Sequence, residues 1–166
     1  MTRMAAKFAG GVLYNGAHPR DIEWAADRVA EGLDARPDHR GEFGFAAYAS
    51  VSVAEDAEAA REAARPPVAF IAGSAPPPVL DRHDIDRDVA SDIGDAIASG
   101  EFPDAFGQVT PAMIEAFCIA GDPATVESQL EAVAETADSV VLGSPLGPEL
   151  ERAIDLAGGA VRRLRA

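Results

Sequence analysis

The stretch that decides the fold is Ser139-Val140-Val141-Leu142-Gly143-Ser144-Pro145-Leu146-Gly147-Pro148. Residues 139–142 form a short apolar run typical of a buried strand, and residues 143–148 are a glycine- and proline-rich turn. The helix that follows has apolar residues at helical spacing, and we expect it to bury Leu150, Ile154, Ala157, Val161 and Leu164. The stretch therefore predicts one strand–turn–helix unit of a parallel α/β fold.

Two further strands are expected upstream, at residues 12–15 and within residues 43–53. Residues 2–9 are interpreted as a helix that ends at Gly10-Gly11, and a second helix begins near Pro19. Strands that alternate with helices pair in parallel through right-handed crossovers. The sequence thus predicts an α/β fold with three parallel strands and flanking helices.

The region between the second and third expected strands is rich in helix signals. Residues 55–65 are expected to form a helix that Pro66-Pro67 breaks, and residues 68–72 are ambiguous between helix and strand. Thr110-Pro111 and Asp122-Pro123 each offer a side-chain oxygen at the N-cap and a proline at the first helical position. Both pairs therefore predict helix starts.

The composition excludes several functional classes. The 166 residues include 14 Lys+Arg and 28 Asp+Glu, and this formal charge of -14 argues against binding to nucleic acid or to an anionic membrane. The apolar fraction of 48% argues against disorder, and no apolar run approaches the roughly 18 residues of a membrane span. The first residues lack the apolar segment of a signal peptide and Cys118 is the only cysteine, so we expect a cytoplasmic protein.

The charged residues also indicate the salt concentration in which the protein works. Lys7 is the only lysine, the other 13 basic residues are arginine, and alanine makes up about a fifth of the chain. A charge of -14 repels itself in dilute buffer, whereas molar salt shortens the screening length to about 3 Å. This composition favours a halophilic protein over an ordinary acidic one.

Few residues have the pattern of a catalytic or metal site. His83 stands among three aspartates, but the spacing matches no metal-ligand motif, and Asp84 or Asp86 is interpreted as a helix N-cap. His18 and His39 are expected to be solvated, and Cys118 is expected to be a small buried apolar residue. Motifs of activated nucleophiles, P-loops and dinucleotide-binding loops do not occur, so the residues alone assign no catalytic side chain and no metal.

Two loops are candidates for ligand binding. Asn15 ends the first strand, where its amide either binds the polar edge of a ring or caps the loop. Residues 143–148 end the last strand, either as a tight turn or as a loop whose glycines let the backbone approach a ligand. In the second case the N–H groups of the next helix face an anion. The residues alone leave both alternatives open at each loop.

Several stretches together resemble the bacterial luciferase-like oxidoreductases. Residues 4–15 are similar to a helix and strand of that family, with Gly10 where the family usually has an aspartate. Other stretches resemble the members that use the deazaflavin coenzyme F420 to reduce a methylenetetrahydropterin. These are residues 67–74, 100–106, 113–117, 119–123 and, most specifically, 140–148. The resemblance covers essentially the whole chain.

This resemblance implies a (β/α)₈ TIM barrel of roughly twice this length. Residues 1–166 would be a single domain forming the C-terminal part of that barrel, about strands six to eight, with a helical insertion at about 67–121. The first half of the barrel, which makes most F420 contacts in the family, would be missing. We therefore expect the chain alone to be inactive.

The resemblance also implies F420 as cofactor and hydride transfer to a methylenetetrahydropterin of the methanopterin or folate type. The cofactor-binding residues that it implies are Thr2 near the coenzyme phosphate and Val12, Asn15, Gly143, Ser144, Pro145 and Gly147 along the site. An FMN-dependent monooxygenase of the same superfamily is one alternative. A non-catalytic half-barrel that serves as a binding or assembly module is another. The possible protein partners are a complementing N-terminal half and a second copy of the chain.

Overall fold

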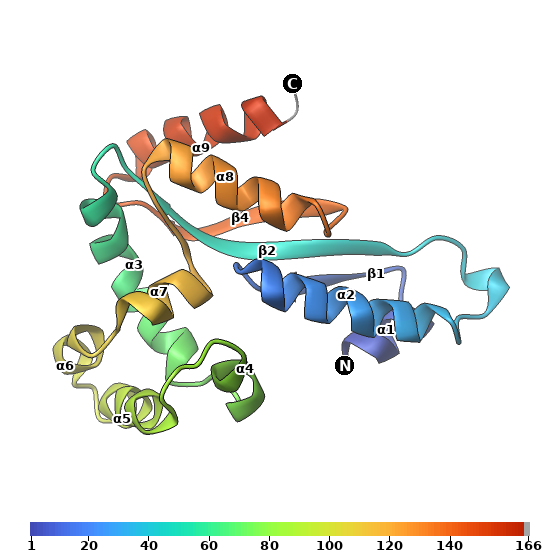
Figure 1. Ribbon diagram of the computed structural model, residues 1–166, viewed down its shortest axis with the longest axis horizontal. Helices are drawn as coiled ribbons and strands as arrows, with labels where there is room; N and C mark the ends of the chain where they lie inside the picture. Colours follow the sequence, from blue (N-terminus) through green and yellow to red (C-terminus); the bar gives the residue numbers. More distant parts are fainter. Residues whose placement is uncertain (165–166) are drawn as a thin grey trace.

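Four parallel strands form the centre of the computed structural model, which describes residues 1–164 (Figure 1). They are β1 (Gly11–Asn15), β2 (Gly44–Val53), β3 (Ile119–Gly121) and β4 (Ser139–Leu146). Strand β2 is central: β4 pairs along one side of it, and β1 and β3 pair with its first and second halves along the other. The predicted α/β class is confirmed.

The strand count differs from the expected three, because β3 is a fourth strand. It has only three residues, all buried, and it follows helix α7 (Pro111–Phe117) after one residue. So short an apolar segment next to a helix has no periodicity of its own, and it becomes a strand only by pairing with Val51–Val53 of β2.

One face of the sheet is covered by helices α2 (Pro19–Leu33), α8 (Pro123–Ala134) and α9 (Leu150–Leu164) (Figure 1). Helix α1 (Thr2–Phe8) packs against α2, where Gly32 allows close contact because a Cβ there would lie 2.6 Å from the Cβ of Ala6. The core between sheet and helices is built from Ile22, Ala25, Val29, Phe45, Ala47, Ala49, Val126, Leu130, Val133, Ala153, Ala157 and Ala160. A 3₁₀ turn, η1 (Asp38–Arg40), precedes β2.

A second lobe lies beyond the carboxyl end of β2 and consists of helices α3 to α7 (Figure 1). They are α3 (Ala57–Ala72), α4 (Pro77–Arg82), α5 (Arg87–Ala98), α6 (Phe102–Gly107) and α7. The lobe has its own apolar cluster, including Val68, Leu80, Ile93 and Met113. Helices α3 and α5 meet at two glycines, because a Cβ on Gly94 would lie 2.7 Å from the carbonyl oxygen of Gly73. Helix α3 begins at Ala57, ahead of residues 67–121 where an insertion is expected, and helices α4 to α7 lie within that range.

The predicted helix break at Pro66-Pro67 is wrong. Helix α3 runs through both prolines to Ala72, so the ambiguous residues 68–72 are helical. The two prolines cannot donate backbone hydrogen bonds, which weakens the helix locally. Burial of Ala60, Ala64 and Val68 on one side of α3 outweighs this local cost, because packing stabilises the helix as a whole.

Only the end of residues 143–148 lies outside a strand, so the turn expected there is shorter than predicted. Strand β4 continues through Gly143, Ser144 and Pro145 to Leu146, with an irregularity in its pairing opposite Ser50–Ser52. Helix α9 also differs from expectation, since it buries Ala153, Ala157 and Ala160, whereas Leu150 and Ile154 are exposed. The expected helix starts at Thr110 and Asp122 are confirmed, as each side chain accepts a backbone N–H of the first turn.

Candidate functional site

The face of the sheet opposite the helices is open. Leu13 is 58% exposed and Val141 43% exposed, and both point to the same side as Ala46 and Tyr48 of β2. Asn15 lies opposite Tyr48 in the register and is exposed on this face as well. In parallel α/β folds ligands bind at the carboxyl ends of the strands, so the end of the face that carries Asn15 is the candidate site.

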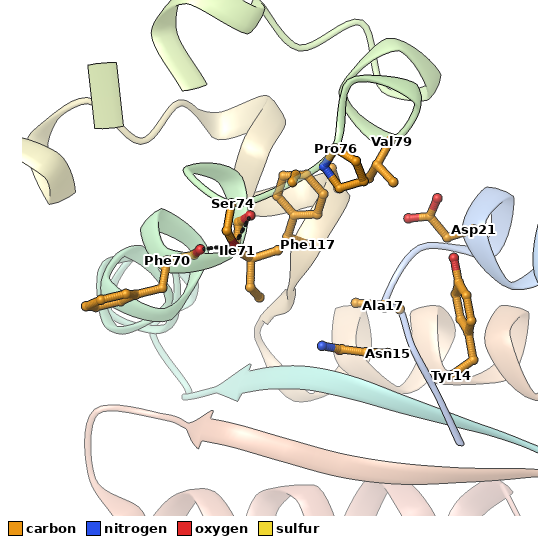
Figure 2. Close-up of a pocket in the computed structure, with 13 residues that line it drawn as sticks. Tyr14, Asn15, Ala17, Asp21, Phe70, Ile71, Ser74, Pro76, Val79 and Phe117 are labelled. Atoms are coloured by element: carbon orange, nitrogen blue, oxygen red, sulfur yellow. Dashed lines mark hydrogen bonds between the residues drawn. The ribbon is translucent and has the colours of Figure 1, made fainter. Parts of the chain in front are cut away.

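A cavity of about 340 Å³ lies at this end, between the end of β1 and the second lobe (Figure 2). One wall consists of the end of β1 and the start of α2, with Tyr14, Asn15 and Asp21. The opposite wall consists of helices α3, α4 and α7 with the segment that joins α3 to α4. It is lined by Phe70, Ile71, Ser74, Ala75, Pro76, Val79, Ala116 and Phe117. Apolar walls with a few polar groups are typical of a site for a small organic ligand.

The polar groups that line the cavity differ in which hydrogen-bond donors and acceptors remain free for a ligand. The amide of Asn15 makes no hydrogen bond with any other side chain or backbone group in residues 1–164, so it is available to a ligand as donor and acceptor. The Ser74 hydroxyl donates to the Phe70 carbonyl at 2.7 Å and keeps its lone pairs as acceptors. The Tyr14 hydroxyl points toward Asp21 on the same wall of the cavity (Figure 2). The set suits a planar ring with a polar edge.

A groove of about 610 Å³ runs between α1 and the free edge of β1 and meets the cavity at Tyr14 and Asn15. It brings together three residues of the predicted cofactor site, Thr2, Val12 and Asn15. Val12 itself is partly buried against the main core. Because the groove follows an unpaired strand edge and is lined by exposed apolar residues, including Met4 and Leu13, it also fits an added β-strand.

The other four predicted residues lie on β4 or just after it, across β2 from this groove. Gly143 faces the open side and supports the Tyr48 ring, because a Cβ at Gly143 would come within 2.5 Å of the Tyr48 hydroxyl oxygen. Ser144 is exposed and Pro145 partly so. Gly147 is packed at the turn into α9, where a Cβ would lie 2.8 Å from that of Ala153. The structure therefore places Asn15 and Gly143 on one face with Tyr48 between them.

A buried ionic cluster beside the cavity was missed by reasoning from the sequence. Asp21, only 5% exposed, accepts hydrogen bonds from Arg82 and from His83 Nε2, the latter at 2.9 Å. No local pattern predicts this cluster, because Arg82 and His83 lie 61 and 62 positions from Asp21 in the sequence. In the sequence, His83 stands near other aspartates, Asp84 and Asp86, and Asp21 belongs to no recognisable motif.

We expected His18 to be solvated. In the structure it is partly buried, and its side chain caps α2. Its Nδ1 accepts the backbone N–H of Arg20 at 3.1 Å, and its ring meets that of His83 edge-on at 4.9 Å. Burial, together with the neighbouring His83 and Arg20, lowers the pKa of His18 below its ordinary value of 6.5. Burial and the carboxylate of Asp21 raise the pKa of Tyr14, which therefore keeps its proton and remains a donor.

The carboxyl ends of β2 and β4 are acidic. Glu55 and Asp56 follow β2, Glu149 follows β4, and Arg152, which faces them, is paired with Glu55. In many (β/α)₈ barrels the loops after the last two strands bind phosphate, but here the surplus of carboxylates repels an anion. Thr2 and Arg3 lie at the start of α1, and Arg3 is paired with Glu31.

Cys118 is buried, and its burial raises the pKa of the thiol to about 12, as expected for a packed apolar residue. Within residues 1–164, His, Cys, Asp and Glu side chains form no group of three or more arranged to hold a metal ion. No helix in these residues combines the length and the apolar character needed to cross a membrane.

Comparison with known proteins identifies several relatives that carry the same name. The sequence profile "Luciferase-like monooxygenase" matches residues 1–139. The 5,10-methylenetetrahydromethanopterin reductase of Methanopyrus kandleri is 42% identical over 162 residues, 97% of this chain and 46% of the relative. The reductase of the same name from Archaeoglobus fulgidus is 37% identical over 163 residues, 95% of this chain and 49% of the relative. The chain thus spans about half the length of the curated relatives it matches.

Solved structures agree with these relatives. The coenzyme F420-dependent tetrahydromethanopterin reductase of Methanopyrus kandleri superposes with a TM-score of 0.89 and 40% identity, over 99% of this chain and 48% of that structure. An F420-dependent secondary alcohol dehydrogenase shares the fold at 19% identity, with a TM-score of 0.67. The match of the family profile to most of the chain, together with the predicted α/β fold, shows that this chain belongs to the luciferase-like monooxygenase family.

Proposed function

We propose that the chain forms the C-terminal part of a barrel in an F420-dependent oxidoreductase that transfers a hydride to a methylenetetrahydropterin. One observation carries the proposal: the similarity to an F420-dependent reductase, at 40% identity and a TM-score of 0.89, extends over 99% of the chain. The domain would span residues 1–166, with the lobe at about 67–121 as the insertion between the last two barrel strands.

The residues present suit a planar deazaflavin with a polar edge and a substrate ring next to it. The free amide of Asn15 can bind the polar edge of a ring, and Gly143 supports the Tyr48 ring, which lies opposite Asn15 on the same face. Thr2, near the start of α1, and Val12 would lie along the groove, while Ser144, Pro145 and Gly147 shape the end of β4. The groove also fits a β-strand, so we assign Thr2 and Val12 less weight than Asn15.

When bound, F420 would supply the hydride, and the protein would supply binding, orientation and exclusion of water. Tyr14 remains protonated and can donate a hydrogen bond to an acceptor on a ring in the cavity. Phe117 and Ile71 form an apolar wall that excludes water from the ring. No nucleophilic side chain is required, in agreement with the buried and protonated state of Cys118.

The proposal includes a protein partner for the open face of the sheet. The exposed side chains of Leu13 and Val141, and the free edges of β1 and β4, fit parallel strands supplied by a segment that corresponds to the other half of the relatives' length. Such a segment would complete the barrel and bring further contacts to both ligands. A second copy of this chain is the competing occupant.

The test combines the 166-residue chain with the part of the Methanopyrus kandleri reductase that it does not match. Oxidation of reduced F420 with methylenetetrahydromethanopterin would be followed by absorbance. We expect turnover only in the mixture, and the same assay with methylenetetrahydrofolate would identify the pterin. A folded mixture that binds neither F420 nor a pterin would contradict the proposal and favour a non-catalytic assembly module. Binding of FMN in place of F420 would favour the monooxygenase alternative.

Val141→Lys tests whether complementation uses the open face. A lysine on the open face would leave the covered core intact but would oppose docking of apolar strands, so turnover should be lost while the circular dichroism spectrum is kept. A lysine at Leu33, which is exposed on α2 away from this face, should leave turnover unchanged. Equal effects of the two lysines would argue against docking on the open face.

We also propose that the protein works in the cytoplasm at high salt. The charge of -14 and the single lysine support high salt, and the single cysteine supports the cytoplasm. Unfolding measured across potassium chloride concentrations would test it, with rising stability up to molar salt as the expected result. Stability that is independent of salt would contradict it.

A further inference from the structure

Asp21 is a buried charge at the edge of the cavity, and the proposed function does not use it. It lies in the first turn of α2 and is 5% exposed, and its carboxylate lines the cavity (Figure 2). A carboxylate is rarely buried without a structural or functional reason, because its removal from water costs several kcal/mol unless partners compensate.

Both oxygens of this carboxylate are used. Oδ1 accepts a hydrogen bond from Nη1 of Arg82, and Oδ2 lies 2.9 Å from Nε2 of His83. Arg82 is the last residue of α4 and His83 is its C-cap, so both partners belong to the second lobe. The side chains are 16% exposed for Arg82 and 4% for His83, which places the whole cluster out of bulk water.

Further contacts fix the two partners against α2. The guanidinium of Arg82 lies over the ring of Trp24 at 4.7 Å, and its backbone carbonyl accepts from Arg20 Nη1 at 3.3 Å. His83 packs edge-on against Phe117 at a centroid distance of 5.9 Å. Within residues 1–164, the side-chain hydrogen bonds between α2 and helices α3 to α7 all involve Asp21 or the Arg82 backbone.

The cluster therefore joins the two walls of the cavity. Asp21 belongs to the wall that also carries Tyr14 and Asn15, and His83 is packed on Phe117 of the opposite wall. Because Phe117 contacts His83 and His83 is held by Asp21, the separation of the walls depends on this carboxylate.

We propose that Asp21 is a positioning residue: it holds α4 and the Phe117 wall at the distance from Tyr14 and Asn15 that admits the ring of a bound ligand. The identity of the ring rests on the proposed function, whereas the positioning itself rests on the contacts above. Loss of the carboxylate leaves the guanidinium of Arg82 without its anionic partner in a buried place, so Arg82 should leave Trp24 and the cavity should widen.

The first test needs no ligand. Trp24 is the only tryptophan of the chain, and the guanidinium groups of Arg82 and Arg28 lie 4.7 Å and 5.7 Å from its ring centroid, so departure of Arg82 should change its fluorescence. Asp21→Asn should shift the emission to longer wavelength and increase quenching by acrylamide, with the helical circular dichroism retained. Asp81→Asn is the matched control, because Asp81 is an exposed residue of α4 paired with Arg87, and it should leave both readouts unchanged. A folded Asp21→Asn protein with unaltered Trp24 emission would overturn the proposal.

Asp21→Glu serves if Asp21→Asn fails to fold. It keeps the charge but adds one methylene, which should push Arg82 away from Trp24 and shift the emission in the same direction. An unshifted, folded Asp21→Glu protein would equally overturn the proposal.

The second test uses the complemented enzyme. Asp21→Asn should raise the KM of the ligand whose ring occupies the cavity, F420 or the methylenetetrahydropterin, about tenfold, while the KM of the other ligand changes by less than about twofold, because only the cavity walls move. Equal changes in both constants would contradict positioning at this cavity. If the unmodified mixture shows no turnover, the proposed function fails and with it the identity of the ring, while the Trp24 measurement still decides whether Asp21 holds the two walls together.

Discussion

The hydroxyl end of the Tyr48 side chain lies directly over Gly143 of the neighbouring strand, where a Cβ would come within 2.5 Å of its oxygen. The two residues share the open face of the sheet with Asn15, which lies opposite Tyr48 in the register. Gly143 thus acts through its lack of a side chain, which lets the Tyr48 ring lie flat across β4. The ring and the Asn15 amide together define the surface at the candidate site.

Gly143→Ala should displace the Tyr48 ring and lower the free energy of unfolding by about 1 to 3 kcal/mol, the usual range for overpacking. In a Tyr48→Ala background the same change should have little effect, so the double-mutant cycle should be strongly non-additive. Urea unfolding of the four proteins measures this coupling. Gly107→Ala, at a position with no atom near the added Cβ, is the control. Additive effects of the two changes would show that the contact does not exist in solution.

Alanine substitutions at two helical glycines should change the stability of the fold in opposite directions. Gly32→Ala should destabilise the fold, because its Cβ would lie 2.6 Å from the Cβ of Ala6 and separate α1 from α2. Gly158→Ala in α9 should stabilise it by up to about 1 kcal/mol, since its nearest neighbour is the Arg162 side chain at 3.5 Å and alanine favours helix. Thermal unfolding would show the difference. A stabilising Gly32→Ala change would mean that α1 is not packed on α2 as described.

His18 should make stability decrease as the solution is acidified. Burial and the nearby His83 and Arg20 lower its pKa in the folded state, so the unfolded chain binds the proton more readily. The stabilising contribution is therefore present above the ordinary pKa of 6.5 and is lost as the pH falls through the lower pKa of the folded state. Protonation also removes the Nδ1 acceptor that caps α2.

The measurement is the free energy of unfolding between roughly pH 5 and pH 7 for the unmodified chain and for His18→Asn. Asparagine keeps a cap acceptor but does not titrate, so the pH dependence should be shallower. His39→Asn is the matched control, because His39 is exposed in η1 and its replacement should leave the slope unchanged. An identical slope for all three proteins would rule out His18 as the source.

Cys118 should resist thiol reagents in the folded chain. Its burial and its pKa of about 12 leave almost no thiolate near neutral pH. Labelling by a chromogenic disulfide should therefore be slow in buffer and fast in urea, and as Cys118 is the only cysteine its rate reports opening of the second lobe. Rapid labelling without denaturant would show that α7 and β3 separate readily.

The sequence by itself determined the class of fold, the helix starts at Pro19, Thr110 and Asp122, and the three longer strands, because these depend on local periodicity and capping. It also identified the family, through stretches such as residues 140–148. It singled out Asn15, whose unbonded amide the structure places in the cavity wall.

The remaining features were decided by the tertiary structure. Helix α3 passes through Pro66-Pro67 because burial of its alanines outweighs the local cost of two prolines. Strand β3 exists only through its pairing with β2. The contact of Asp21 with Arg82 and His83 joins residues more than 60 positions apart. Such distant pairings depend on how the second lobe packs against α2, and no local pattern in a single sequence predicts that packing.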